Sequence, residues 1–202
     1  HRCFSFYEVI VQMKVTTKLI TTFLFSLGMA TSGATLAAGW NEGGGEQDEA
    51  LHLTPNLEAG MELYEVCAAC HLTEGWGTKD GTFPMLAGQH KNVLIKQLAD
   101  IRALNRDNPT MYPFALTKAW GLDKSTSPSQ AIADVAGYIT TIKMNPEPGL
   151  GDGTDLALGK KLYADNCVKC HGENGEGNAE KFYPRIQGQH YTYMLRQFEG
   201  IR

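Results

Sequence analysis

The sequence predicts an all-α protein built from two tandem modules of one kind, the second of them incomplete. The residues from Cys67 to Arg102 align without a gap with those from Cys167 to Arg202, and 12 of these positions are identical. Such internal repetition indicates a duplicated structural unit. Apolar residues recur at helical spacing after each copy of the motif, and no alternating pattern typical of strands competes with them.

Three segments precede the repeat. Residues 1–12 lie upstream of the first methionine, and we expect them to be outside the native start. Residues 13–38 combine two lysines, an apolar stretch and small residues, which is the layout of a secretory signal peptide. A retained membrane anchor is the alternative, but the apolar stretch is shorter than the ~20 residues that a spanning helix needs. Residues 39–53 are rich in glycine and acidic side chains and predict a flexible leader.

The charge of the exported part excludes one class of partner. From Gly39 onward the chain has 15 Lys and Arg against 21 Asp and Glu, a formal net charge of −6. It contains no basic stripe, which argues against nucleic-acid binding. An acidic surface favours partners with basic patches and mainly accelerates encounter.

The repeat defines the domain organisation. Module one is expected over residues 54–145, a linker with prolines and glycines over 146–153, and module two over 154–202. Module two has no counterparts of residues 103–143. We therefore expect the chain to be a truncated form of a longer protein.

The elements of module one follow in order. A helix leads into the motif CAACH, a glycine-rich loop follows, and the segment starting at GQH (88–90) predicts a second helix. The segment NPTMYPF predicts an irregular loop. Residues 127–143 then carry apolar side chains at helical spacing and predict a closing helix capped by Ser127 or Ser129.

The motif C-x-x-C-H stands at residues 67–71 and again at 167–171. A shared zinc ion is disfavoured, because zinc sites pair their CxxC units within ~15–20 residues. A thioredoxin-like redox pair requires a βαβ setting. Two plain disulfides would leave the repeated histidine without a role. C-x-x-C-H is also the attachment signature of c-type haem, in which the two cysteines bind one porphyrin and the histidine binds its iron.

The sequence therefore predicts two covalently bound haem c groups. Haem one is expected on Cys67 and Cys70, with His71 on its iron, and haem two on the cysteines Cys167 and Cys170, with His171 as the ligand. At this point the chain resembles the class I cytochromes c, in which a proline carbonyl accepts a hydrogen bond from the iron-ligating histidine. Pro84 and Pro184 match that position, each 13 residues past its histidine.

The sixth ligand of haem one is expected to be Met111, in the loop between the second and closing helices, because a methionine sulfur favours Fe(II) and suits electron transfer. Met85 adjoins Pro84 and so lies on the histidine side, and Met144 adjoins the linker. We interpret Met61, Met85 and Met194 as core residues. Module two has no equivalent of Met111, so its sixth ligand would lie beyond Arg202.

The repeated histidines His90 and His190 are rival iron ligands, and a bis-histidine haem is the alternative to a His/Met one. Both stand in the GQH triplet at the expected start of a helix. Repetition indicates a role in the shared scaffold, so we favour a place at the helix N-terminus or on a surface near the haem.

Over residues 54–202 the chain resembles the tandem dihaem cytochromes c of the c-four type, on its two CxxCH motifs, FPMLAGQH, YPRIQGQH and NPTM. The resemblance implies an exported periplasmic electron carrier, not an enzyme, with no small-molecule substrate and with redox proteins such as a membrane oxidase or dehydrogenase as partners. Membrane association is the alternative location. A haem subunit of a periplasmic dehydrogenase is the alternative function, and a dihaem peroxidase is a third. The leucine after His71, where the second motif has glycine, departs from the pattern.

Overall fold

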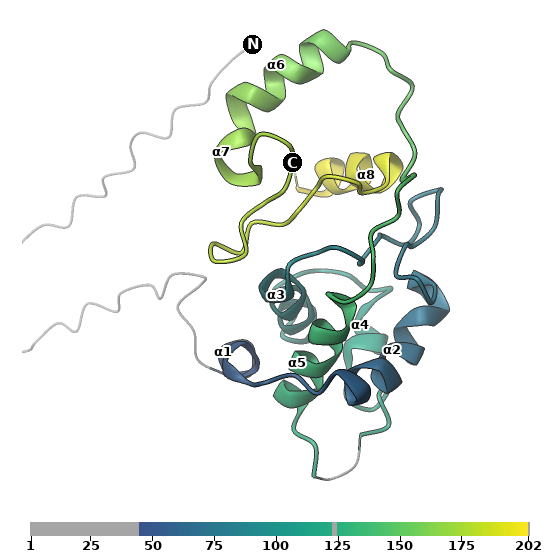
Figure 1. Cartoon of the computed structure of the whole chain (residues 1–202), viewed down its shortest axis with the longest axis vertical. Helices are drawn as coiled ribbons and strands as arrows, with labels where there is room; N and C mark the ends of the chain where they lie inside the picture. Colours follow the sequence, from purple (N-terminus) through teal and green to yellow (C-terminus); the bar gives the residue numbers. More distant parts are fainter. Residues whose placement is uncertain (1–44, 123–124, 202) are drawn as a thin grey trace, which may run out of the picture. The chain divides into compact units, whose positions relative to one another are not determined.

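A computed structural model describes residues 45–122 and 125–201 of the chain. The predicted signal peptide, the segment before it and the first part of the leader lie outside these residues. Helices account for all the regular structure of the described part, which confirms the all-α prediction (Figure 1). One isolated antiparallel bridge joins Asn178 to Tyr183. The eight helices of the described part are α1 (Glu46–His52), α2 (Leu57–His71), α3 (Lys91–Arg102), α4 (Tyr112–Ala115), α5 (Pro128–Ile139), α6 (Leu156–Asn166), α7 (Val168–His171) and α8 (Tyr191–Ile201).

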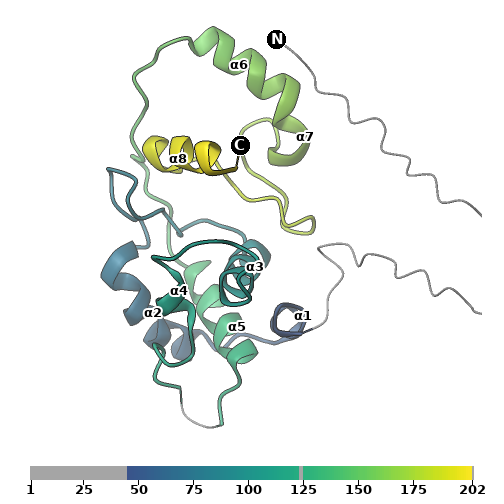
Figure 2. The ribbon, with the colours of Figure 1, turned by 180° about the vertical axis from the view of Figure 1, so that it is seen from behind.

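The core of module one forms where α5 packs on α2, α3 and α1, and both ribbon views show these helices gathered together (Figures 1 and 2). Gly60 of α2 permits the closest approach, because a Cβ there would lie 2.1 Å from the Asp134 carbonyl oxygen. The buried side chains of this core come from all four helices: Ala50, Tyr64, Leu94, Ile95, Ile132, Val135, Ala136 and Ile139.

The closing helix is present where the sequence predicts it, although it ends four residues earlier. Ser127 caps α5, and its hydroxyl accepts a hydrogen bond from the Gln130 N–H at 3.1 Å. Pro128 follows at the first helical position, where its missing N–H costs nothing. Asn56 caps α2 in the same manner, by accepting from the N–H groups of Glu58 and Ala59.

Helix α1 corrects the prediction of a flexible leader over residues 39–53. Residues 46–52 form a helix because module one provides partners for them. Ala50 is fully buried, and the Glu46 carboxylate pairs with Arg102 through Oε2–Nε at 2.6 Å and Oε1–Nη2 at 2.8 Å. The Ser129 hydroxyl donates to Glu49 at 2.7 Å. Residues 46–52 are thus a helix packed on module one rather than a flexible segment.

Module two repeats the motif helix and the helix after the GQH triplet, as α6–α7 and α8, with one difference at its motif. Helix α2 runs unbroken through Cys67 and Cys70, whereas α6 ends before Cys167 and α7 starts after it. The cause is one additional residue, since Tyr64 stands three positions before its cysteine and Tyr163 stands four before its own. Both tyrosine hydroxyls nevertheless donate to the carbonyl that follows the histidine, at 2.8 and 2.6 Å. The break at Cys167 accommodates the additional residue while the tyrosine hydrogen bond is retained.

In the described part of the chain, none of the helices is long and apolar enough to cross a membrane.

Candidate functional site

The last turn of α2 brings the first motif together. Cys67 and Cys70 stand one helical turn apart, half-buried and not joined in a disulfide. His71 is buried, and its Nδ1 lies 2.9 Å from the Pro84 carbonyl oxygen. Because a carbonyl only accepts, the bond requires the proton on Nδ1, which leaves the lone pair of Nε2 free to bind a metal.

Burial also keeps this histidine neutral. Loss of solvent lowers the pKa of His71, and the hydrogen bond to the Pro84 carbonyl opposes that effect only in part. A neutral imidazole with a fixed tautomer is the form that binds iron.

Module two builds the same geometry. Cys167 and Cys170 are half-buried and free of a disulfide, and His171 Nδ1 lies 2.9 Å from the Pro184 carbonyl oxygen. The two histidine–proline distances are thus equal, although the helices that carry the motifs differ. The iron-related roles of these residues stay predictions.

The glycine-rich loop holds each proline against its histidine. The Gly77 N–H donates to the His71 carbonyl at 2.9 Å, and the Gly177 N–H donates to His171 at 2.7 Å. Gly77 has a φ of 65°, and a Cβ there would lie 2.3 Å from the Phe83 carbonyl oxygen and 2.5 Å from that of Pro84. Only glycine permits the loop to approach this closely.

The cysteine environment disfavours reactive-thiol chemistry. Burial, and after it the neighbouring Cys70, raises the pKa of the Cys67 thiol to about 11. A redox-active cysteine needs a lowered pKa, so this site does not favour that role. No group of three or more His, Cys, Asp or Glu side chains within residues 45–122 and 125–201 could hold a metal ion by itself. Free thiols one turn apart beside a histidine with a fixed tautomer fit covalent haem attachment.

Met111 stands at the N-cap of α4, half-buried in the segment that joins α3 to α5. Asn108 fixes its backbone, since the Met111 N–H donates to both the backbone and side-chain oxygens of Asn108 at 3.1 Å. Its role as an iron ligand stays a prediction. Met85 is buried, as expected, but Met61 is half exposed and is not a core residue. Met144 packs against Gly88 and Gly188.

The GQH triplets have a role that the sequence did not predict. Gln189 binds both backbone groups of Met85, with Oε1 accepting from the N–H at 2.9 Å and Nε2 donating to the carbonyl at 2.9 Å. Gln89 binds Arg185 in the same way, at 2.9 and 3.0 Å. The glutamine of each module thus forms two hydrogen bonds with the backbone of the residue that follows the proline of the other module.

The two histidines complete this reciprocal contact. His90 Nε2 lies 2.8 Å from the Glu176 carbonyl oxygen, and His190 Nε2 lies 2.6 Å from that of Trp76. His90 stands at the N-cap of α3, as expected, although its side chain makes no capping hydrogen bond there. Residues 76 and 176 are equivalent in the repeat. Each of these contacts from module one to module two thus has an equivalent contact from module two to module one, and we call this the exchange rule. The sequence signal that could have indicated these contacts is the GQH triplet, which recurs at the same distance after each CxxCH motif.

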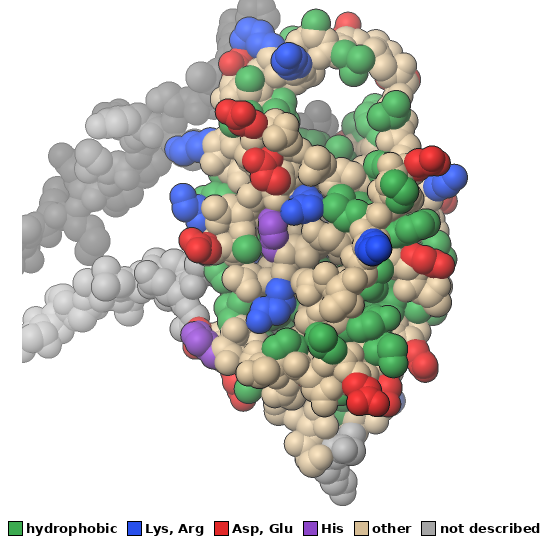
Figure 3. Space-filling model, in the orientation of Figure 1, with side chains coloured by type: hydrophobic (Ala, Val, Ile, Leu, Met, Phe, Trp, Pro, Cys, Tyr) green, Lys and Arg blue, Asp and Glu red, His purple; other side chains and the backbone are tan. Residues whose placement is uncertain are grey.

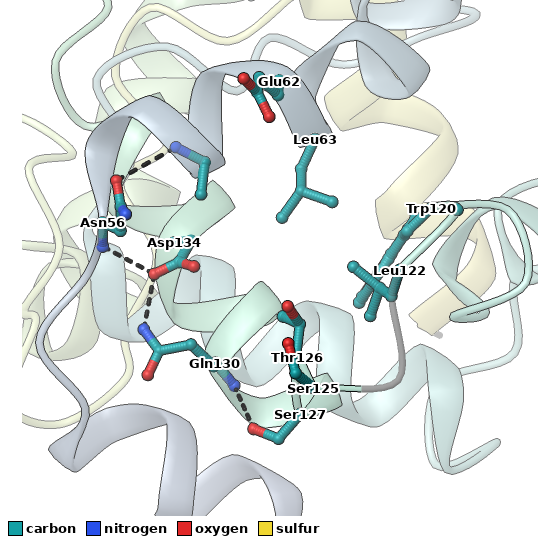
Figure 4. Close-up of a pocket in the computed structure, with 12 residues that line it drawn as sticks. Asn56, Glu62, Leu63, Trp120, Leu122, Ser125, Thr126, Ser127, Gln130 and Asp134 are labelled. Carbon is teal, nitrogen blue, oxygen red and sulfur yellow. Dashed lines mark hydrogen bonds between the residues drawn. The ribbon is translucent and has the colours of Figure 1, made fainter.

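A separate pocket lies beside α2 and the start of α5 (Figure 4). Leu63, Trp120 and Leu122 line its apolar side. Asp134 Oδ1 accepts hydrogen bonds from the Asn56 N–H and from Gln130 Nε2, both at 2.7 Å. These polar groups tie the starts of two helices together. No predicted haem-site residue lines the pocket, and we assign it to the scaffold.

Comparison with known proteins agrees with the geometry. The family model described as "Cytochrome c" matches residues 57–143 and 156–201. A cytochrome c4 of Azotobacter vinelandii is 35% identical over 160 residues, which cover 75% of this chain and 74% of that protein. The crystal structure of reduced recombinant cytochrome c4 from Pseudomonas stutzeri superposes with a TM-score of 0.56 at 32% identity, covering 74% of this chain and 83% of that one.

Two further matches are subunits or enzymes of larger size. A cbb3-type cytochrome c oxidase subunit, FixP, of a Bradyrhizobium species is 31% identical over 63% of this chain and 43% of its own length. A thiosulfate dehydrogenase (TsdBA) of Marichromatium purpuratum superposes with a TM-score of 0.57 at 28% identity, over 72% of this chain and 33% of that one.

Cytochromes c carry covalently attached haem, and the motifs at 67–71 and 167–171 fit two such groups. The duplicated histidine–proline geometry, the all-α modules and these matches agree with one another. The chain belongs to the cytochrome c family and, within it, to the cytochromes c4, which are dihaem electron carriers and not enzymes.

Proposed function

We propose that this protein carries single electrons in the periplasm from a donor protein to a terminal oxidase or reductase. The observation that carries the proposal is the pair of His–Pro contacts at 2.9 Å, each beside two free cysteines. An outer-sphere carrier needs iron whose ligands move little between its two oxidation states, and a histidine fixed by such a hydrogen bond meets that need.

The roles of individual residues are part of this proposal. Cys67 and Cys70 attach haem one, whose iron takes His71 and Met111 as its axial ligands. In module two Cys167 and Cys170 attach haem two, and His171 binds its iron.

The periplasmic location rests on the lysines and apolar residues of 13–38, which are typical of a signal peptide. Haem attachment to CxxCH is also consistent with export. We propose that residues 13–38 are removed and that the mature protein begins near Gly39.

The partner class is proposed from charge and from the comparisons. Acidic and basic side chains are interspersed over the face shown in Figure 3, with no large area of one sign. The formal charge of −6 from Gly39 onward favours partners with basic patches. The likeness to an oxidase subunit supports an oxidase as electron acceptor.

A haem count tests the core of the proposal. A pyridine haemochrome assay on the full-length protein should find two covalently attached haems per chain. Replacing Cys167 and Cys170 together with serine should reduce the count to one. A count of zero or one in the unmodified protein would contradict the proposal.

A second measurement tests the partner. Membranes that contain a cbb3-type oxidase should oxidise the reduced protein, at a rate that falls as salt is raised, because salt screens the charges that steer encounter.

The alternative function is a haem subunit of a periplasmic dehydrogenase, which the likeness to the thiosulfate dehydrogenase favours. Rapid reduction by a co-purifying dehydrogenase, without any oxidation by those membranes, would favour the alternative.

A further inference from the structure

Arg185 occupies a fixed position beside the second motif. It directly follows Pro184, whose carbonyl oxygen accepts from His171 at 2.9 Å. The module-one side chain of Gln89 holds its backbone on both sides, at 2.9 Å on the N–H and 3.0 Å on the carbonyl. The backbone of Arg185, and so the base of its side chain, is therefore held in place next to the second CxxCH site.

The guanidinium itself lacks an adequate partner. Its Nε is buried without a hydrogen bond, the one such side-chain atom among the described residues. Nη1 donates to Met144 Sδ at 3.2 Å, and a thioether sulfur is a weak acceptor. No carboxylate of residues 45–122 or 125–201 forms an ion pair with Arg185 within 4.0 Å. The Glu176 carboxylate lies near enough for Arg185 to add to the backbone hydrogen bonds that lower its pKa, but the hydrogen bond that it accepts comes from the Asn174 N–H at 2.8 Å.

This arrangement is costly unless an anion completes it. A guanidinium presents five N–H donors, and a charged group that is partly removed from water needs an acceptor of opposite charge. A carboxylate is the best geometric match, because two parallel N–H donors can bind its two oxygens.

The equivalent residue of module one is Met85. Gln189 grips the backbone of Met85 with the same two hydrogen bonds. The backbone contacts at the two positions are therefore alike, and only the side chains differ. Whatever accepts from the guanidinium is specific to the surroundings of residue 185.

We propose that Arg185 binds a propionate carboxylate of haem two and thereby makes the two haems electrostatically unequal. This inference rests on the proposed function, because the propionates are the anionic groups of the haem that Cys167 and Cys170 would attach. The guanidinium charge disfavours the additional positive charge of Fe(III), so it stabilises the reduced state of that haem.

The test uses the full-length protein with both haems, and the pyridine haemochrome count is taken first on every variant. A variant that loses haem tests the proposed function, whereas a variant with two haems tests this inference alone. In Arg185→Met, which copies the side chain of module one, the ratio of reduced to oxidised haem two at a fixed applied potential should fall about fivefold. The propionate bending mode of the resonance Raman spectrum should shift as well.

Two further variants separate direct binding from general damage. Arg185→Lys keeps the charge and should recover most of the ratio. Arg196→Met removes a cation that donates to the Gly81 carbonyl of module one at 2.8 Å, so it weakens contact between the modules without touching Arg185. It should leave the haem-two ratio within twofold of the unmodified protein.

Paramagnetic NMR of the haem methyl groups assigns each potential to its module. The proposal is overturned if Arg185→Met leaves the haem-two ratio and the Raman band unchanged. It is equally overturned if the shift belongs to haem one, or if Arg196→Met produces the same shift.

Discussion

The reciprocal glutamine contact predicts a specific and symmetric loss of stability. In Gln189→Ala, the side chain loses two hydrogen bonds to Met85 and one to the His190 N–H, at 2.9, 2.9 and 3.0 Å. Each such bond contributes about 1 kcal/mol net, so the two bonds between modules account for about 2 kcal/mol. Because Gln89 makes the same three bonds, Gln89→Ala should cost a similar amount.

Urea unfolding of the holoprotein, followed by far-ultraviolet circular dichroism, measures this cost as a lower midpoint at an unchanged slope. Gln187→Ala is the matched control, because Gln187 lies two residues away with an exposed side chain. The control should change the free energy of unfolding by less than about 0.5 kcal/mol. If either variant costs no more than the control, or if the two costs differ by more than about 1 kcal/mol, the exchange of equivalent bonds is not what joins the modules.

Three other predictions follow from single residues. Leu72 has a φ of 64° and a ψ of 162°, a backbone conformation that favours glycine, and its side chain is 42% exposed. Leu72→Gly should therefore remove strain and raise the free energy of unfolding by about 1 kcal/mol, measured as a higher Tm. A lower Tm would contradict this. Met111→Ala should abolish the Met–Fe(III) charge-transfer band and lower one of the two haem potentials, and persistence of both would exclude Met111 as a ligand. Hydrogen bonds from the Thr78 hydroxyl and then from Thr82 lower the pKa of Asp80 from 3.8 to about 2. The ionised carboxylate therefore stabilises the folded protein fully above about pH 4, and this contribution is lost as the pH falls through 2. An NMR titration of the Asp80 side chain measures this pKa.

The sequence predicted the parts of the fold that depend on local pattern. Helix α5 and its Ser127 cap follow from apolar spacing and cap chemistry, both of which act within a few residues. The contact between His71 and Pro84 spans 13 residues and recurs in module two, so repetition made it visible. Each of these features is encoded twice or within one turn of helix.

The features that sequence reasoning missed depend on distant partners. Helix α1 is acidic and short, and it is stabilised by Arg102 and Ser129, which lie 56 and 80 residues from their partners. The glutamine contacts join residues 96 and 104 positions apart. No periodicity marks such pairs, because their geometry arises only when the two modules meet.

The exchange rule of the GQH contacts has a consequence for the symmetry between the two modules. Residue 89 binds residue 185 while residue 189 binds residue 85, which is the pattern of an isologous homodimer with two-fold symmetry. Covalent linkage through residues 146–153 gives the two modules a high effective concentration for each other and allows their sequences to differ. In a homodimer positions 85 and 185 would be the same residue, whereas here one is methionine and the other arginine. Covalent fusion thus permits a direction of electron flow that a symmetric dimer forbids.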